Sequence, residues 1–303
     1  MRNFTFKGLF LTAVFMLLGC LSIQAANDDL ITKQITINLD KAGTLPNKIA
    51  SSEMYKITNL KIIGEINGTD WNMIREMAGR DNRGYGTEGK LSVLDLSEAK
   101  IVKGGDSYYP GDNCYTSNDE IGEKAFTDCS RLTSLTLPVG ITSIGYDAFA
   151  YCSGLTSLTL PAGITSIGEY AFSGCSGLTS LNLPAGITWI GESAFSYCSG
   201  LTSIYVYAEK VPRIGRYAFE GCASRKCTLY VPKGTYDDYR LSGFGDFENI
   251  VEFDATGIDK TTTATDVEEV SRYSVNGQRL VGPTKGLNIV KYSDGSVKKV
   301  AVE

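Results

Sequence analysis

Apolar and polar positions repeat at a fixed interval through the middle of this 303-residue chain. Phenylalanine, cysteine and glycine each return after 23 or 24 residues between about residues 121 and 222. The phenylalanines are Phe126, Phe149, Phe172, Phe195 and Phe219, the cysteines are Cys129, Cys152, Cys175, Cys198 and Cys222, and the glycines are Gly122, Gly145, Gly168, Gly191 and Gly215. A period in this range is typical of proteins in which each repeat stacks on the next.

Each repeat begins with a short stretch of alternating apolar residues. In one unit, Leu158 and Leu160 lie on one side of a predicted strand, whereas Ser157 and Thr159 lie on the other. Pro161 follows directly and ends the strand, because proline has no backbone N–H for the sheet. The pattern therefore predicts one short strand in every repeat.

The second half of the repeat supplies the rest of its core. Ile164 and Ile167 form another inward pair, and Gly168 permits a tight bend. Ala171 and Phe172 begin a short helical or 3₁₀ turn, whose ring closes the core. One unit cannot bury its apolar side alone, but stacked units can. We therefore predict an α+β repeat solenoid with a parallel β-sheet and short helical turns.

The repeat unit resembles the BspA-like class of leucine-rich repeats. The matching pattern is Leu-x-x-Leu-x-Leu-Pro followed by Ile-Gly-x-x-Ala-Phe-x-x-Cys, and it runs cleanly from Ile121 to Cys222. The resemblance implies a leucine-rich-repeat solenoid in a surface or secreted protein of anaerobic bacteria. It also implies adhesion to host matrix proteins, and it is a weak guide to the ligand.

The flanking segments are predicted to cap the solenoid. Residues 26–120 form an N-terminal cap with irregular rungs at 57–62 and 91–96, and with a helix that Thr69 or Asp70 would N-cap. Residues 223–254 form a C-terminal cap with a rung at 229–232, a short helix and an edge strand at 250–253. Caps are needed because an open solenoid exposes apolar core and an unpaired strand.

The last part of the chain has a different composition. Residues 255–270 are polar and threonine-rich, which is typical of a linker. Residues 271–303 alternate in polarity around Asp294-Gly295, a strong hairpin signal. This small β module resembles the C-terminal modules that some anaerobic bacteria add to secreted proteins. It either directs sorting and attachment or merely packs and tethers.

The first 25 residues have the features of a secretory signal peptide. Arg2 and Lys7 precede an uncharged run, and small residues end at Ala25. The run is about half the length that a bilayer span needs. We expect ordinary cleavage after Ala25; the alternative is a lipobox that ends at Cys20, which would then carry a lipid anchor. Either route exports the chain to the cell surface, the outer membrane or the medium.

Charge and composition argue against several functions. The net charge is −5 and there is no basic stripe, which disfavours nucleic acid as a partner. The chain has no histidine, so it lacks the commonest general base and the commonest metal ligand. The carboxylates of Glu169 and Glu192 occupy one repeat column on an outer ridge rather than a cleft. We predict no enzyme activity, no catalytic residue, no cofactor and no metal.

Two loops and the cysteines have ordinary structural explanations. The run from Gly84 to Lys90 resembles a phosphate-binding loop but departs from its pattern, because leucine follows Lys90 where the pattern requires serine or threonine. The acidic and aromatic loop at 104–120 does not have calcium-loop spacing and is either solvated or a recognition loop. The five repeat cysteines are expected as buried free thiols. A bridge between Cys222 and Cys227 is the weaker alternative for the cap.

The strand face is the candidate partner-binding surface. Its middle column runs through Thr159 and Asn182 to Tyr205, and Tyr207 ends the next column. These tyrosines either anchor a partner or cap the last rung. Trp189 replaces a serine in another column and is a second candidate anchor. We expect a protein-binding or adhesion function with an extracellular protein partner; the alternative is a glycan-binding accessory protein.

Overall fold

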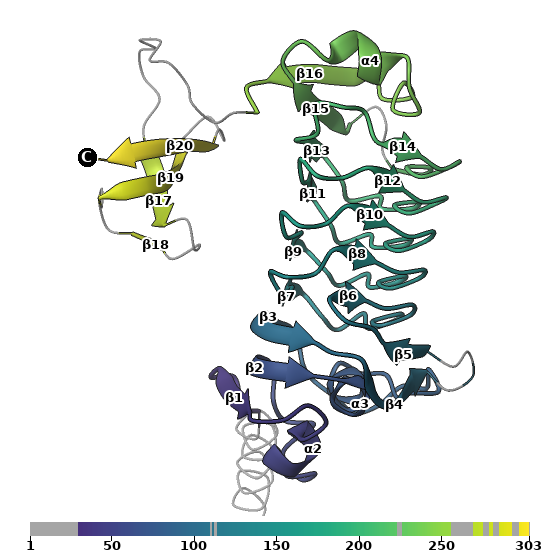
Figure 1. Ribbon diagram of the computed structural model, residues 1–303, viewed down its shortest axis with the longest axis vertical. Helices are drawn as coiled ribbons and strands as arrows, with labels where there is room; N and C mark the ends of the chain where they lie inside the picture. The colour runs from purple at the N-terminus through teal and green to yellow at the C-terminus, as the bar shows by residue number, and fades with distance from the viewer. Residues whose placement is uncertain are drawn as a thin grey trace, which may run out of the picture.

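The computed structural model describes residues 30–109, 111, 114–222, 226–255, 269–274, 279–280, 285–292 and 297–302. The described residues between 30 and 255 form an elongated solenoid whose successive turns lie one above another (Figure 1). The predicted repeat solenoid with a parallel sheet is therefore confirmed. The signal peptide, the Cys20 alternative, almost all of the threonine-rich linker and the Asp294-Gly295 turn lie outside the described residues.

One long side of the solenoid is built of parallel strands, and we call it the strand face. In order along the solenoid its strands are β1 (Ile35–Leu39), β2 (Asn59–Ile66), β3 (Val93–Ile101), β7 (Ser134–Thr136), β9 (Ser157–Thr159), β11 (Ser180–Leu183), β13 (Ser203–Val206), β15 (Thr228–Pro232) and β16 (Asn249–Phe253). Hydrogen bonds join β1 to β9 in one sheet and β11 to β16 in another. Leu135 pairs with Leu158, and Leu181 with Ile204, one repeat further along. Equivalent residues of neighbouring repeats therefore form straight columns.

Another parallel sheet, which we call the second sheet, lies next to the strand face, and the sequence pattern did not predict it. Its strands are β6 (Glu120–Ile121), β8 (Ser143–Ile144), β10 (Ser166–Ile167), β12 (Trp189–Ile190) and β14 (Arg213–Ile214). Each strand has two residues, which is too short to show an alternating pattern. The predicted inward position of Ile167 is confirmed, because its side chain is fully buried.

Hydrogen-bonded turns form the remaining side, which we call the turn face. Within a turn, the Cys175 N–H donates to the Phe172 carbonyl at 3.1 Å. Between turns, the Phe149 N–H donates to the Ala171 carbonyl at 2.7 Å, and the same bond recurs in the next repeat. These bonds form a turn ladder along the solenoid. The expected helical or 3₁₀ segments are thus tight turns that are tied to their neighbours.

The core follows the predicted inward positions. Phe149, Phe172 and Phe195 are fully buried, and their rings stack at centroid distances of 4.9 and 5.1 Å with interplanar angles of 5° and 2°. Leu158 and Leu160 are buried, whereas Thr159 is exposed. The continuous stack joins all repeats into one core, so each turn depends on its neighbours for burial.

The repeat glycines serve a different purpose from the one expected. The backbone of Gly168 is not in the left-handed region, so no bend requires glycine there. A Cβ atom on Gly168 would lie 2.7 Å from the carbonyl carbon of Gly145 in the preceding turn. Glycine is therefore required because neighbouring turns approach closely at this column.

The N-terminal cap contains α2 (Leu45–Lys48), α3 (Gly68–Met77), and the antiparallel pair β4 (Gly104–Tyr109) and β5 (Cys114–Thr116). Neither Thr69 nor Asp70 caps α3. Asn67 is the N-cap, and Asp70 is the third helical residue of a capping box. The buried Asp70 carboxylate also accepts hydrogen bonds from the backbone of Gly43 and Leu45 at 2.6 and 2.8 Å. Asp70 therefore ties the start of α3 to the segment before α2.

The C-terminal cap has the predicted order of strand, helix and strand. After β15, α4 (Tyr236–Arg240) leads to β16, which pairs parallel with β15. The buried Tyr239 hydroxyl donates to the Ala208 carbonyl at 2.6 Å and fixes the helix against the preceding repeat. The tail contains a separate antiparallel sheet of β17 (Glu269–Ser274), β18 (Arg279–Leu280), β19 (Gly286–Tyr292) and β20 (Val297–Val302).

Candidate functional site

The middle column of the strand face brings together three of the candidate residues. Asn182 pairs with Tyr205 in the register of β11 and β13, and Tyr205 pairs with Tyr230 of β15. Thr159 occupies the same column on β9 and, like Asn182, is exposed. From Thr159 to Tyr230 the column therefore changes from small polar side chains to aromatic rings, and Val251 of β16 follows Tyr230.

An aromatic cluster forms the C-terminal end of this face. Tyr205 stacks on Tyr230 with a centroid distance of 4.3 Å and an interplanar angle of 6°. Phe253 of β16 meets Tyr205 and Tyr207 edge-on, at 5.7 and 5.2 Å. Burial raises the pKa of the Tyr205 and Tyr207 hydroxyls. Both tyrosines are only half-buried, so they pack on the terminal strands and still present ring surface to solvent.

Trp189 lies on a different surface. It belongs to β12 in the second sheet, between Ser166 and Arg213 of the adjacent strands. Its ring is 36% exposed, and the Arg213 guanidinium lies 5.7 Å from the ring centroid. The structure therefore does not bring Trp189 together with the strand-face candidates.

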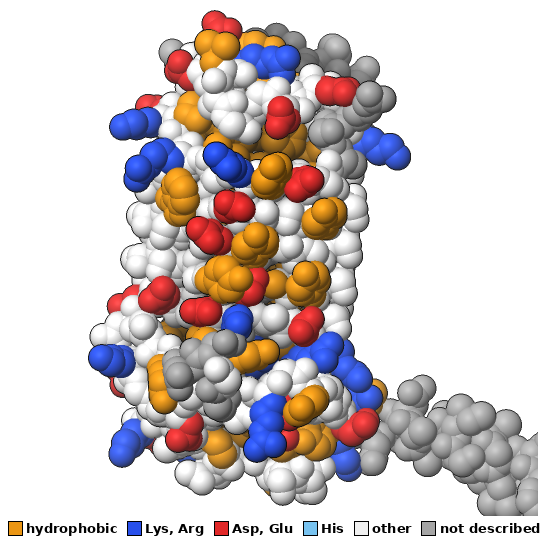
Figure 2. Space-filling view, turned by 90° about the vertical axis from the view of Figure 1, so that its right-hand side faces the viewer, with side chains coloured by type: hydrophobic (Ala, Val, Ile, Leu, Met, Phe, Trp, Pro, Cys, Tyr) orange, Lys and Arg blue, Asp and Glu red, His pale blue; other side chains and the backbone are white. Residues whose placement is uncertain are grey.

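The turn face carries exposed tyrosines that the sequence analysis missed. Figure 2 shows hydrophobic and acidic side chains scattered along this side of the solenoid. Tyr151, Tyr197 and Tyr217 are 60%, 61% and 62% exposed. Their backbones are left-handed, with φ of 60°, 58° and 59°. This conformation is uncommon outside glycine and asparagine, so nothing in the sequence points to it at a tyrosine.

The repeat cysteines form a buried column, as predicted. The described cysteines from Cys114 to Cys227 are free thiols, including Cys222 and Cys227, for which a bridge was the alternative. The sulfur of Cys175 donates to the Phe149 carbonyl at 3.1 Å, and that of Cys198 donates to the Phe172 carbonyl at the same distance. Burial raises the pKa of Cys175 to about 12. Hydrogen bonding with Cys198 lowers the pKa of Cys222, but that thiol is also buried. These thiols are structural, since a reactive cysteine needs exposure as well as a lowered pKa.

The other two candidate segments are those at 84–90 and 104–120. Within the described residues no group of three or more acidic or cysteine side chains is placed to hold a metal ion. The segment before β3 is a turn in which Arg80 bridges to Gly86. The segment at 104–120 was expected to be a loop but contains the antiparallel strands β4 and β5; its Asp112 and Asn113 lie outside the described residues. None of the helices that the structure describes has the length and apolarity to cross a membrane.

Comparisons with known proteins agree with this geometry. The family model of the BspA type leucine-rich repeat region matches residues 116–236 in six copies. No curated protein matches the chain.

Several solved structures of bacterial leucine-rich repeat proteins match parts of the chain. The T. pallidum leucine-rich repeat protein TpLRR is 27% identical, with 46% of this chain and 67% of that one covered and a TM-score of 0.37. A Bacteroides capillosus leucine-rich repeat protein is 30% identical, with 30% of this chain and 65% of that one covered and a TM-score of 0.26. A Bacteroides ovatus leucine-rich repeat protein is 18% identical, with 67% of this chain and 51% of that one covered and a TM-score of 0.39. The chain thus spans about half to two thirds of these structures. On the six matched copies, the repeat region of this chain belongs to the BspA-type leucine-rich repeats.

Proposed function

We propose that this chain is an exported binding protein that recognises another protein through its strand face. The BspA-type repeats give a rigid, extended scaffold with regular columns of side chains. Scaffolds of this kind serve binding rather than chemistry, and we propose no enzymatic activity. An extracellular protein, from a host or a neighbouring cell, is the partner class that we favour.

The aromatic end of the strand face supports this proposal most directly. Tyr205 and Tyr207 are half-buried, which holds each ring in one orientation while leaving part of it open. Rigid aromatic side chains are the usual anchors of protein interfaces, because they bury a large area at low entropic cost. The exposed Asn182 and Thr159 extend the surface with small polar groups that add little steric hindrance.

A glycan-binding accessory role is the second candidate. The parallel rings of Tyr205 and Tyr230 are also suited to stacking on a sugar. The two functions are distinguished by measuring binding of the mature chain to a panel of extracellular proteins and a panel of polysaccharides. Saturable binding to the protein panel supports our proposal, and binding to polysaccharides alone supports the alternative.

Variants locate the binding surface. Tyr205→Ala and Tyr207→Ala should each weaken binding by about tenfold or more, as expected for interface anchors. Tyr151→Ala is the matched control, because this tyrosine is exposed on the turn face. The strand-face proposal fails if the control weakens binding as much as the two strand-face variants. Absence of binding to both panels would contradict both functions.

Export and anchoring are tested by the intact mass of the mature chain from its own cells. A chain that begins with acylated Cys20 would be a lipid-anchored surface protein. A chain that begins near Ala26 and lacks residues 271–303 would have a cleaved sorting module and would be released or reattached outside the cell. An uncleaved chain retained inside the cell would contradict export.

A further inference from the structure

The turn ladder ends differently at its two ends. At the N-terminal end, side chains of the cap satisfy carbonyl groups of the first turn. The Ala125 carbonyl accepts hydrogen bonds from the Trp71 indole and the Arg75 guanidinium, both at 2.9 Å. The Glu123 carbonyl accepts one from the Tyr108 hydroxyl at 2.8 Å. The cap therefore closes this end with matched donors.

At the C-terminal end the ladder donors have no such match. In the preceding repeat, the N–H groups of Ser193, Phe195 and Tyr197 donate to the next turn at 2.9, 2.7 and 2.6 Å. The equivalent N–H groups in the last turn belong to Tyr217, Phe219 and Gly221. No hydrogen bond to an acceptor in the described part of the chain is formed by these three groups. Among the described residues, the last turn thus presents an open edge of backbone donors.

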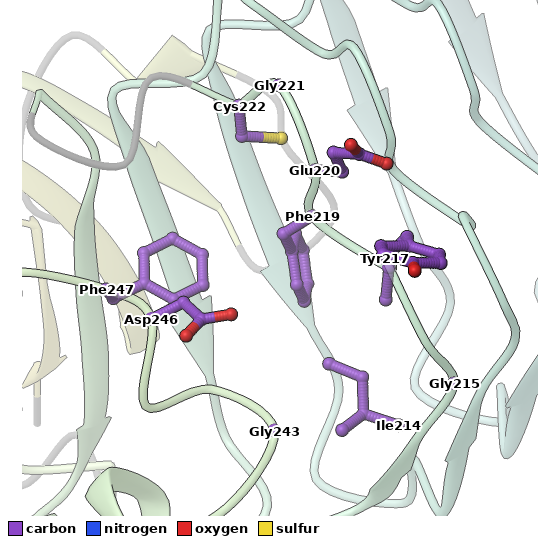
Figure 3. Close-up of a pocket in the computed structure, with 11 residues that line it drawn as sticks. Ile214, Gly215, Tyr217, Phe219, Glu220, Gly221, Cys222, Gly243, Asp246 and Phe247 are labelled. Atoms are coloured by element: carbon purple, nitrogen blue, oxygen red, sulfur yellow. The ribbon is translucent and has the colours of Figure 1, made fainter.

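This open edge lines a pocket of about 280 Å³ between the last turn and the C-terminal cap. Figure 3 shows the Phe219 ring between Phe247 and Tyr217. The carboxylates of Glu220 and Asp246 are exposed at the same pocket. The pocket therefore combines backbone donors, an aromatic floor and negative charge.

We propose that this pocket binds a lysine- or arginine-containing peptide segment of a partner protein, which adopts the turn conformation of a repeat and continues the turn ladder. Three alternate carbonyl groups of the segment accept hydrogen bonds from Tyr217, Phe219 and Gly221. Main-chain hydrogen bonds to an open backbone edge give affinity when a peptide adds to a sheet edge, and the same bonds are available at this turn edge. The site is separate from the strand face and goes beyond the function proposed above.

The repeat columns indicate which side chains the segment carries. The Ser173 and Ser196 hydroxyls, one repeat apart, lie 2.9 Å from each other, and Glu220 is the next residue in this column. A lysine at the same position of an added segment therefore lies beside the Glu220 carboxylate. The peptide residue that follows Phe219 in its column must be small, because Phe244 and Phe247 already pack on the Phe219 ring, at centroid distances of 5.6 and 5.4 Å.

A synthetic peptide tests this geometry. The probe is acetyl-Gly-Glu-Ser-Ala-Ala-Lys-Tyr-amide, which copies residues 191–197 with alanine for Phe195 and lysine for Ser196. Amide hydrogen exchange, resolved by NMR on the mature protein, is measured with and without peptide. At saturation, exchange at Tyr217, Phe219 and Gly221 should slow by about tenfold or more, as for newly formed backbone hydrogen bonds.

Charge variants separate the proposed contact from general attraction to an acidic protein. Glu220→Lys should weaken binding of the lysine peptide by about fivefold and favour a peptide with glutamate at that position. Glu169→Lys is the matched control, because Glu169 is exposed on the same face and outside the pocket. It should leave both affinities unchanged.

Three results would overturn the proposal. The first is saturable peptide binding that leaves exchange at the three amides unchanged, and the second is an equal effect of the two charge variants. The third is concentration-dependent protection of the same amides without peptide, which would assign the edge to a second copy of this chain. These three outcomes concern the pocket alone. They do not depend on whether Tyr205→Ala weakens binding at the strand face.

Discussion

The ring of Tyr151 lies across Gly174 of the next turn, where a Cβ atom would be 2.8 Å from the Tyr151 Cδ1 atom. Tyr197 and Gly221 repeat this relationship at 2.7 Å. Along this column tyrosine and glycine alternate, because a ring on one turn needs a residue without a side chain on the next. Both members have left-handed backbones.

This relationship predicts a steric and conformational cost for Gly174→Ala. Alanine at a φ of 73° is strained, and its Cβ would also collide with the ring. We expect a loss of about 1–3 kcal/mol in the free energy of unfolding, measured by denaturant titration. In a Tyr151→Ala background the loss should fall by about 1 kcal/mol, since the collision is removed. Strict additivity of the two substitutions would contradict the contact.

The phenylalanine stack predicts a larger loss in the core. Phe172→Ala removes a fully buried ring between two stacked neighbours and should cost about 3–5 kcal/mol. Val139→Ala, at a site that is 77% exposed in the same repeat array, should change stability by less than about 0.5 kcal/mol. A loss under about 1 kcal/mol for Phe172→Ala would mean that the stack contributes little.

The buried thiols predict a decline of stability in alkali. Burial raises the pKa of Cys129 to about 11 and that of Cys175 to about 12. The unfolded chain loses these protons near the ordinary thiol pKa of about 8.5, so stability is full below that pH and falls as pH rises towards the folded values. Denaturant titrations from pH 7 to 11 should show this fall. In Cys175→Ala it should be shallower by about 1.4 kcal/mol per pH unit above pH 9. Equal slopes of stability against pH in the wild type and in Cys175→Ala would contradict a raised pKa for the Cys175 thiol.

The N-terminal cap depends on one carboxylate more than on the helix cap itself. Asp70→Ala leaves three backbone N–H groups, those of Gly43, Leu45 and Asn67, without their acceptor. We expect a loss of at least about 3 kcal/mol. Asn67→Ala removes the side-chain cap of α3 and should cost about 1 kcal/mol. Thermal unfolding shows which variant loses more stability. A larger loss in Asn67→Ala than in Asp70→Ala would contradict the prediction.

The sequence predicted those parts of the fold that depend on side-chain pattern. Alternation of Leu158 and Leu160 indicated the strand, and the recurrence of Phe172 indicated the core stack. Gly168 was predicted to permit a bend, but it is required because two backbones approach closely. The two causes leave the same glycine in the sequence. Asp70 was mistaken for the N-cap, since an aspartate at the third helical position is equally typical of a helix start.

The candidate site was less accessible to sequence. The column through Asn182 and Tyr205 followed from the repeat register alone. The register also placed Trp189 in another column, but it did not show that this column belongs to a second sheet, because strands of two residues carry no periodic signal. The open donors at Tyr217 and Phe219 belong to the backbone, so no residue type identifies them. Only the hydrogen bonds of the earlier turns show which partners are missing in the last one.

The most direct test of the proposed function is side-chain footprinting of the chain, free and bound to a protein recovered from the extracellular panel. Hydroxyl-radical labelling should fall at Tyr205, Tyr207 and Tyr230 in the complex, while Tyr146 and Tyr151 on the turn face keep their reactivity. Protection confined to the turn-face tyrosines, with the strand-face tyrosines unchanged, would contradict recognition through the strand face.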